Sequence, residues 1–203
     1  MALFGKKNAN YISAKETKRI SKENRKITNE IEKKRNRKNI PESEYITTMK
    51  NPENVVEFDN VHTYFFTDIG TVKAVDGVSF EIPQGKTVGV VGESGCGKTV
   101  TSKAIMGLLP TPQTQIKKDG DSAILFHGEN LLDYTEKQMT HIRGSKISMI
   151  FQDPMTSLNP TMKIGNQIME SILIHQKISK KEAEKQALEM LELVKIPNAA
   201  QRM

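Results

Sequence analysis

Two stretches in the middle of the chain alternate apolar with polar residues, as strands with one buried face do. They are VVEFDNV, which begins at Val55, and VSFEI, which spans residues 78–82. Residues 88–91 are apolar on both faces, which predicts a central strand buried on both sides. Residues 123–126 (AILF) and 147–151 (ISMIF) predict two further strands. The pattern therefore predicts a small antiparallel layer beside a fully buried central strand.

Three segments have the spacing of apolar residues that is typical of helices. They span residues 99–109, 164–175 and 179–194. Two capping boxes indicate where helices begin: Thr135 with Gln138, and Ser179 with Glu182. The last helix has one apolar face and is expected to pack on another element through Ala183, Ala187, Leu188, Leu191 and Val194.

The composition favours one sizeable domain, alone or with a tail, because the 203 residues are 36% apolar and 27% charged. With Cys96 as the single cysteine, an intramolecular disulfide is excluded, and a reducing compartment such as the cytoplasm is expected. No stretch approaches the roughly 20 consecutive apolar residues of a spanning helix. The first residues, MALFGKKNAN, lack the apolar core of an export signal. Neither a membrane-spanning helix nor an export signal is therefore expected.

The net charge of +6 is distributed unevenly along the chain. Residues 1–50 contain 14 Lys and Arg against 6 Asp and Glu, whereas residues 51–203 contain 16 against 18. This distribution disfavours a uniformly basic nucleic-acid-binding domain. It separates a basic extension, residues 1–53, from a slightly acidic domain, residues 54–203.

Two interpretations of the basic extension remain open. Its few apolar residues predict a solvated, mostly disordered tail. Alternatively, Ser13 and Glu16 have the spacing of a capping box, and Ile20, Ile27 and Ile31 would share one narrow face of a helix. A basic amphipathic helix of this kind would lie on an anionic membrane surface.

The most specific motif is GESGCGKT, residues 92–99, which matches the phosphate-binding loop pattern of Gly, four residues, Gly, Lys and Ser or Thr. It lies between the predicted central strand and a predicted helix, where its glycines can aim successive N–H groups at a triphosphate. Lys98 would reach the terminal phosphates and the Thr99 hydroxyl would bind Mg²⁺. An ordinary glycine-rich turn is the structural alternative. Cys96 is either a reactive thiol or a small residue that fills the loop.

A second motif, ISMIFQDPMTSLNP, spans residues 147–160. An acidic residue after an apolar strand can bind Mg²⁺, which would make Asp153 the ligand. A glutamine there can instead place its carbonyl oxygen on the metal or orient the attacking water, which would make Gln152 the working residue. Spacing alone leaves both possibilities open.

Four phrases, VKAVDGVSFEI, VGVVGESGCGKT, IRGSKISMIFQDPMTSLNP and LELVKIP, resemble the ATP-binding subunits of ABC transporters of the oligopeptide and dipeptide import type. The resemblance runs from about Val55 to the C-terminus. It implies an α/β fold: a P-loop NTPase core of the ABC-ATPase type, an antiparallel β-layer and a partial helical subdomain. The implied cofactors are ATP and Mg²⁺.

The resemblance also implies residue roles. Gln152 takes the role of the Q-loop glutamine, which senses the nucleotide and contacts the coupling helices of the membrane subunits, and Asp153 becomes a turn former. Gln152 thereby joins Thr99 as a predicted metal contact. An aromatic residue on the first strand of the β-layer stacks on adenine, for which Phe65 is the best match and Tyr64 a close rival. The implied nucleotide contacts in the loop are Gly92, Glu93, Ser94, Gly95, Cys96, Gly97, Lys98, Thr99 and Val100.

The implied partners are transmembrane permease subunits, a second ATP-binding subunit and, indirectly, an extracellular solute-binding protein, with no nucleic acid. The implied location is peripheral, on the cytoplasmic face of the cell membrane. Import of nickel or another small solute is an alternative to peptides. Alternatives of other classes are a different P-loop protein, a non-catalytic nucleotide-binding chain, or a nucleic-acid-binding protein that acts through its basic tail.

Three motifs of the family find no match up to Met203: the signature motif, the Walker B strand with the catalytic glutamate, and the switch histidine. On this basis the chain by itself is expected either to bind ATP weakly or to be an incompletely folded fragment. None of the four histidines is at the switch position: His62, His127, His141 and His175.

Overall fold

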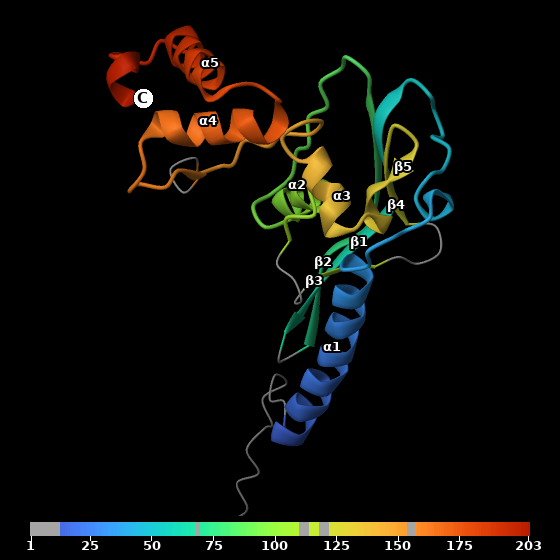
Figure 1. Ribbon diagram of the computed structural model, residues 1–203. Coiled ribbons are helices and arrows are strands. Elements are labelled where there is room, and N and C mark those ends of the chain that lie inside the picture. Colours follow the sequence, from blue (N-terminus) through green and yellow to red (C-terminus); the bar gives the residue numbers. More distant parts are fainter. Residues whose placement is uncertain (1–12, 68–69, 110–113, 118–121, 154–156) are drawn as a thin grey trace, which may run out of the picture. The chain divides into compact units, whose positions relative to one another are not determined.

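The computed structural model describes residues 13–67, 70–109, 114–117, 122–153 and 157–203 (Figure 1). Pro110, which was expected to end a helix, lies outside these residues. The chain divides into two compact units, Met1–Thr140 and His141–Met203.

The first unit is built on one antiparallel sheet. Its strands are β1 (Asn54–Thr67), β2 (Gly70–Pro83), β3 (Thr114–Lys117), β4 (Ala123–Phe126) and β5 (Glu129–Asn130). The two long strands, β1 and β2, pair along most of their length, and the rings of Phe58 and Phe80 stack with centroids 4.3 Å apart. The strand order is β2-β1-β4-β5, and β3 pairs with β1. The predicted antiparallel layer and the predicted strand at residues 123–126 are therefore confirmed.

The core of this unit lies between the sheet and the helices that follow it. Val61 and Ile124 are fully buried, and each lies on a strand that pairs with neighbours on both sides. The other buried apolar side chains of the unit include Val56, Phe58, Val75, Ala104, Met106, Leu125, Leu131 and Met139.

Glu57 is an acidic side chain within this sheet and is only 1% exposed. Its carboxylate accepts hydrogen bonds from the backbone N–H groups of Lys50 and Asn51, both at 2.8 Å, and from Asn54 Nδ2 at 2.9 Å. Burial acts to raise the pKa of Glu57, but these hydrogen bonds and the charge of Lys50 outweigh it and lower the pKa. The carboxylate therefore ties the end of the basic extension to β1.

The substitution Glu57→Gln is expected to lower the free energy of unfolding by about 1 to 3 kcal/mol at neutral pH. The amide NH₂ group replaces one carboxylate oxygen, and it would face a backbone N–H donor from which it cannot accept a hydrogen bond. A lowered folded-state pKa stabilises the protein above the unfolded value of about 4.3, and this stability is lost as the pH falls through the folded value. Urea unfolding at several acidic pH values measures both effects. Glu53→Gln, on an exposed side chain of the same segment, is the control. Equal stability and equal acid sensitivity of Glu57→Gln and wild type would contradict the assignment.

Three helices belong mainly to the first unit: α1 (Ala14–Arg35), α2 (Lys98–Ile105) and α3 (Glu136–Ile142). The second unit contains α4 (Ile164–His175) and α5 (Lys180–Leu193). Short 3-10 turns occur at η1 (Glu42–Glu44), η2 (Leu131–Asp133) and η4 (Ala199–Arg202). The predicted helix at 99–109 begins one residue earlier than expected and ends four residues earlier.

Both predicted capping boxes are present. The Ser179 hydroxyl accepts from the Glu182 N–H, and the Glu182 carboxylate accepts from the Ser179 N–H. Thr135 and Gln138 make the same reciprocal pair before α3. These contacts satisfy N–H groups that have no partner within the helix.

In the second unit α4 packs against α5. Met169 of α4 lies against Ala183 and Ala187 of α5, and both alanines are fully buried. The predicted apolar face is correct at these positions and at Leu191, but Val194 is 65% exposed. Val194 is the C-cap, beyond the last residue of α5, so the helical spacing that defines the apolar face no longer applies there.

The basic extension contains the helix α1. The sequence pattern allowed either a basic helix or a solvated tail in this region. Ser13 is its N-cap and accepts from the N–H of Glu16 at 3.2 Å. None of the residues of α1 is fully buried.

Two predicted strands are wrong. Residues 88–91 and 147–151 have extended or irregular backbone outside the sheet, apart from one isolated bridge at Ile147. Val91 is 96% exposed and Ile150 is 95% exposed. An apolar strand is buried only where neighbouring strands and covering helices are available, and within the described residues neither segment pairs in the sheet.

Candidate phosphate-binding site

The predicted phosphate-binding loop runs directly into α2. Gly97 is the N-cap of α2 and has a φ of 96°, and Gly95 has a φ of 83°, so both lie in the left-handed region that glycine readily adopts. The first backbone bond of the helix joins the N–H of Thr101 to the carbonyl of Gly97, at 2.8 Å. The preceding N–H groups have no acceptor within the helix and carry its positive dipole end.

Lys98 lies across this loop. Its Nζ donates to the carbonyl oxygens of Gly92 at 2.6 Å and Glu93 at 2.7 Å, and lies 3.6 Å from Cys96 Sγ. The ammonium group is therefore held over the loop by neutral acceptors. A phosphate, which carries more negative charge than a carbonyl oxygen, can replace these acceptors.

The loop is fixed to the sheet through Gly97. Thr63 pairs with Val75 and Tyr64 with Lys73, so Ala74 is an extra residue in β2, a β-bulge. A Cβ atom on Gly97 would lie only 2.6 Å from the carbonyl oxygen of Ala74. This close approach requires glycine and brings the start of α2 against β2.

Cys96 is exposed, and its side chain covers Gly92, where a Cβ atom would lie 2.6 Å from Sγ. The Cys96 side chain therefore packs against Gly92 within the loop.

Thr99 is exposed in the first turn of α2, so its hydroxyl is available to a cation beside bound phosphates. Within the part of the chain that the structure describes, no group of three or more His, Cys, Asp or Glu side chains could hold a metal ion. A single hydroxyl ligand suits Mg²⁺, which takes most of its ligands from phosphates and water.

The two aromatic candidates for adenine stacking differ in their surroundings. Tyr64 is buried, and its hydroxyl donates to Asp76 Oδ1 at 2.6 Å. Phe65 is half-buried on β1 and pairs with Val72, two residues before the bulge in β2. Phe65 therefore lies on the strand pair that approaches the loop.

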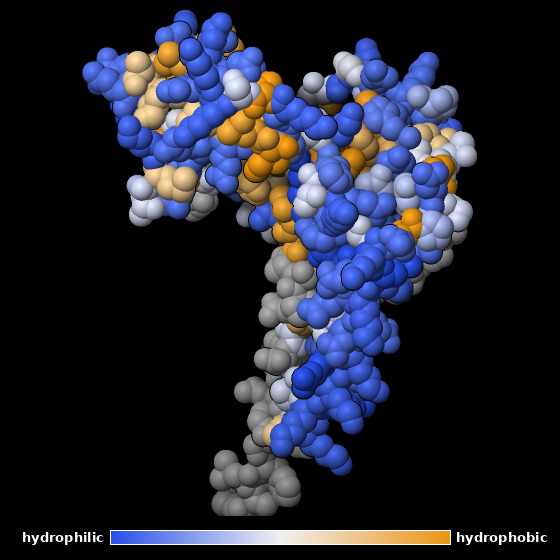
Figure 2. Space-filling view, viewed as in Figure 1, coloured by the Kyte–Doolittle hydropathy of each residue, from blue (hydrophilic) through white to orange (hydrophobic). Residues whose placement is uncertain are grey.

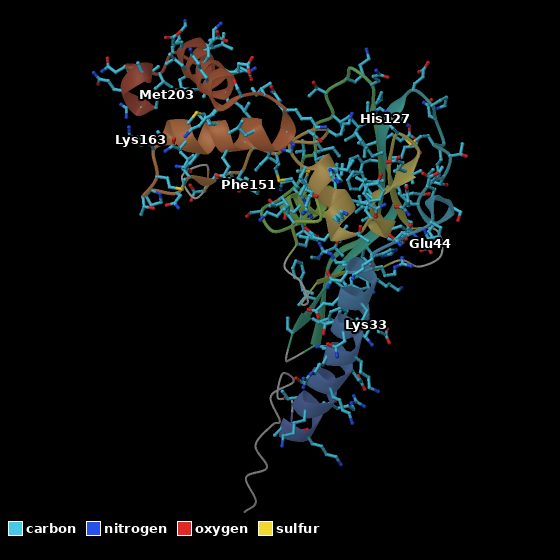
Figure 3. The ribbon with its side chains drawn as sticks, viewed as in Figure 1. Lys33, Glu44, His127, Phe151, Lys163 and Met203 are labelled. Atoms are coloured by element: carbon cyan, nitrogen blue, oxygen red, sulfur yellow. The ribbon has the colours of Figure 1, made fainter. Side chains whose placement is uncertain are left out.

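Gln152 and Asp153 lie in the second unit and are both exposed (Figure 3 labels the neighbouring Phe151). The residues from Gly92 to Val100, by contrast, all lie in one continuous segment of the first unit. The structure thus brings together the loop residues and leaves Gln152 in a separate unit.

A polar cluster around Asp76 was not predicted. Asp76 accepts from Tyr64, lies 2.7 Å from His62 Nδ1 and pairs with Lys73 at 3.2 Å. The hydrogen bonds from Tyr64, His62 and Lys73 lower the pKa of Asp76. The cluster joins β1 to β2 on both sides of the bulge, and the irregular register that assembles it leaves no periodic signal in the sequence.

The sequence profile of the ABC transporter family matches residues 75–203, well over half of the chain. A dipeptide transport ATP-binding protein of Bacillus subtilis is 51% identical over 151 residues, which cover 74% of this chain and 44% of the relative. An oligopeptide transport ATP-binding protein of Salmonella typhimurium is 44% identical over 162 residues, which cover 79% of this chain and 47% of the relative. The chain thus spans about half the length of the curated relatives it matches.

A solved structure, the dimeric bacterial ABC transporter cassette MJ0796, superimposes with a TM-score of 0.59 and 22% sequence identity. The match covers 70% of this chain and 58% of that chain. At this identity the similarity shows the fold alone, which is that of an ABC transporter cassette.

Proposed function

Because the chain belongs to the ABC transporter family, we propose that it binds Mg-ATP at residues 92–100 and provides the nucleotide-binding part of a peptide-import ATPase. The observation that carries the proposal is the loop wrapped around Lys98 Nζ at the start of α2. A helix N-terminus and an adjacent lysine form a site for the phosphates of a nucleotide.

Within this site each group has one task. The loop N–H groups surround the phosphates, and Lys98 exchanges its carbonyl acceptors for the β- and γ-phosphate oxygens. The Thr99 hydroxyl holds Mg²⁺, which neutralises part of the phosphate charge. Phe65 stacks on adenine, which contributes about 1 to 3 kcal/mol by analogy with base stacking in other proteins.

Hydrolysis is proposed for the whole protein, with Gln152 contacting the metal and the attacking water. Phosphoryl transfer depends on positioned groups that act together, and removal of such groups commonly lowers the rate by orders of magnitude. A general base for the water is therefore also required.

Peptides are the proposed cargo, because relatives that are 50% to 51% identical to this chain are named as dipeptide and oligopeptide transport ATP-binding proteins. The proposed partners are transmembrane permease subunits and a second ATP-binding subunit, with the protein on the cytoplasmic face of the membrane. Among the described residues, no helix is both long and apolar enough to cross a bilayer. Peptide import predicts that cells whose full protein carries Lys98→Ala lose the uptake of labelled dipeptide and keep the uptake of nickel. The nickel alternative predicts the opposite result.

Alkylation of Cys96 provides a direct test of nucleotide binding, because Cys96 is the single cysteine and is exposed. Saturating Mg-ATP is expected to slow its reaction with iodoacetamide at least about tenfold, since bound phosphates would cover the loop. Mass spectrometry of the alkylated chain over time measures the rate. Mg²⁺ alone is the control and is expected to leave the rate unchanged. An equal rate with and without Mg-ATP would count against the site.

A further inference from the structure

The two sides of α1 differ sharply in their contacts. Its half-buried residues recur every three or four positions along one side, and α1 contacts the strands β1 and β3. Asn24 Nδ2 donates to the carbonyl of Thr67 at 3.1 Å, and Arg35 pairs with Glu136. The half-buried apolar residues on this side are Ile20, Ile27 and Ile31. The isoleucine stripe therefore faces the sheet rather than the solvent.

The opposite side of α1 is basic. Seven exposed Lys and Arg side chains lie there, within an arc of about 120° at 100° per residue: Lys15, Lys18, Arg19, Lys22, Arg25, Lys26 and Lys33. We call these seven residues the basic face. The acidic residues of α1 flank it: Glu16, Glu23 and Glu30 on one side and Glu32 on the other. The basic face contains no acidic residue and is about 27 Å long, from Lys15 to Lys33.

The side of α1 seen in Figure 2 is hydrophilic along most of its length, and Figure 3 labels Lys33 near its C-terminal end. A charged surface of this length suits an extended array of negative charges rather than one phosphate group. Each Lys or Arg close to an anionic lipid surface contributes about 1 kcal/mol to binding.

We propose that the basic face of α1 binds an anionic phospholipid bilayer by electrostatic contact, without insertion of apolar side chains. Lipid is favoured over nucleic acid for two reasons. The residues of α1 include no aromatic side chain that could stack on bases, and residues 51–203 add no excess of positive charge. The choice of lipid also rests on the membrane location in the proposed function.

The test is cosedimentation of the full chain with vesicles of phosphatidylcholine, with or without phosphatidylglycerol. Wild type is expected to bind the vesicles that contain phosphatidylglycerol and to be released by salt. The test variant replaces Lys15, Lys18, Lys22 and Lys26 by Gln, which keeps high helix propensity. Its affinity is expected to fall at least about tenfold.

The matched control replaces Lys180, Lys181, Lys185 and Lys195 by Gln. These four lysines are exposed in the second unit, and the control has the same net charge as the test variant. It is expected to bind vesicles within about twofold of wild type. Far-UV circular dichroism verifies that both variants keep the helix content of wild type.

Three results would overturn the proposal: no binding of wild type to anionic vesicles, an equal loss in both variants, or tighter binding of duplex DNA or RNA than of vesicles at the same salt concentration. Protection of Cys96 by Mg-ATP in the same samples separates the two proposals. Vesicle binding without this protection would remove the proposed nucleotide site and leave the membrane contact. Protection of Cys96 without vesicle binding would remove the proposed membrane contact and leave the nucleotide site.

Discussion

Replacement of Lys98 by Ala is expected to lower the affinity for Mg-ATP at least about 100-fold. The Nζ atom lies within 2.7 Å of two carbonyl oxygens of the loop, so it is already positioned where phosphate oxygens would bind. Two charge-assisted hydrogen bonds of about 1.5 to 3 kcal/mol each account for a loss of this size. Titration with a fluorescent ATP analogue measures the affinity directly.

Thermal unfolding gives a second measurement of the same effect. Mg-ATP at about 100 times its dissociation constant stabilises wild type by about 2.7 kcal/mol, and this stabilisation is expected to vanish in Lys98→Ala. Lys86→Ala is the control, because Lys86 is exposed and lies before the loop. A shift of equal size in Lys98→Ala and wild type would remove the assignment of the loop as the nucleotide site.

The second large effect is expected from Gly97→Ala. The φ of 96° costs a non-glycine residue about 1 to 2 kcal/mol, and the methyl group would overlap the Ala74 carbonyl oxygen at 2.6 Å. Overpacking adds about 1 to 3 kcal/mol, so the free energy of unfolding is expected to fall by about 2 to 5 kcal/mol. Because the start of α2 must also move away from β2, the affinity for Mg-ATP is expected to fall with it.

Gly95→Ala separates the two causes. Gly95 also has a left-handed φ, but an added Cβ would meet nothing within 4 Å. Its loss of stability is therefore expected to be about 1 to 2 kcal/mol, from the backbone conformation alone. Denaturant unfolding of both variants tests this difference. Equal losses for Gly95→Ala and Gly97→Ala would show that contact with Ala74 does not hold the loop in place.

Much of the phosphate loop was predictable from the sequence because its chemistry is local. The order of glycines, lysine and threonine in residues 92–99 sets the turn, the helix start and the position of the ammonium group within a few bonds of one another. The helices at 164–175 and 179–194 were predictable for the same reason. A capping contact such as that between Ser179 and Glu182 joins residues only three apart.

The strands at 88–91 and 147–151 were predicted from apolar runs, and the structure does not form them. An apolar run records a tendency to be buried, but burial in a sheet requires partner strands from distant parts of the sequence. Val91 and Ile150 are therefore almost fully exposed despite their β-propensity. The hydrophobic pattern alone carries no information about whether those partners are in place.

The sequence by itself determined the family, the loop chemistry, the capped helices and the concentration of positive charge in the first quarter of the chain. The tertiary structure alone decided that the bulge at Ala74 lies against Gly97, that Asp76 joins Tyr64 and His62, and that the isoleucines of α1 face the sheet. The physical reason is the separation along the chain between the residues that interact. Loop, cap and helix signals act between residues a few positions apart, whereas these contacts join residues that only the pairing of strands and the packing of α1 bring together.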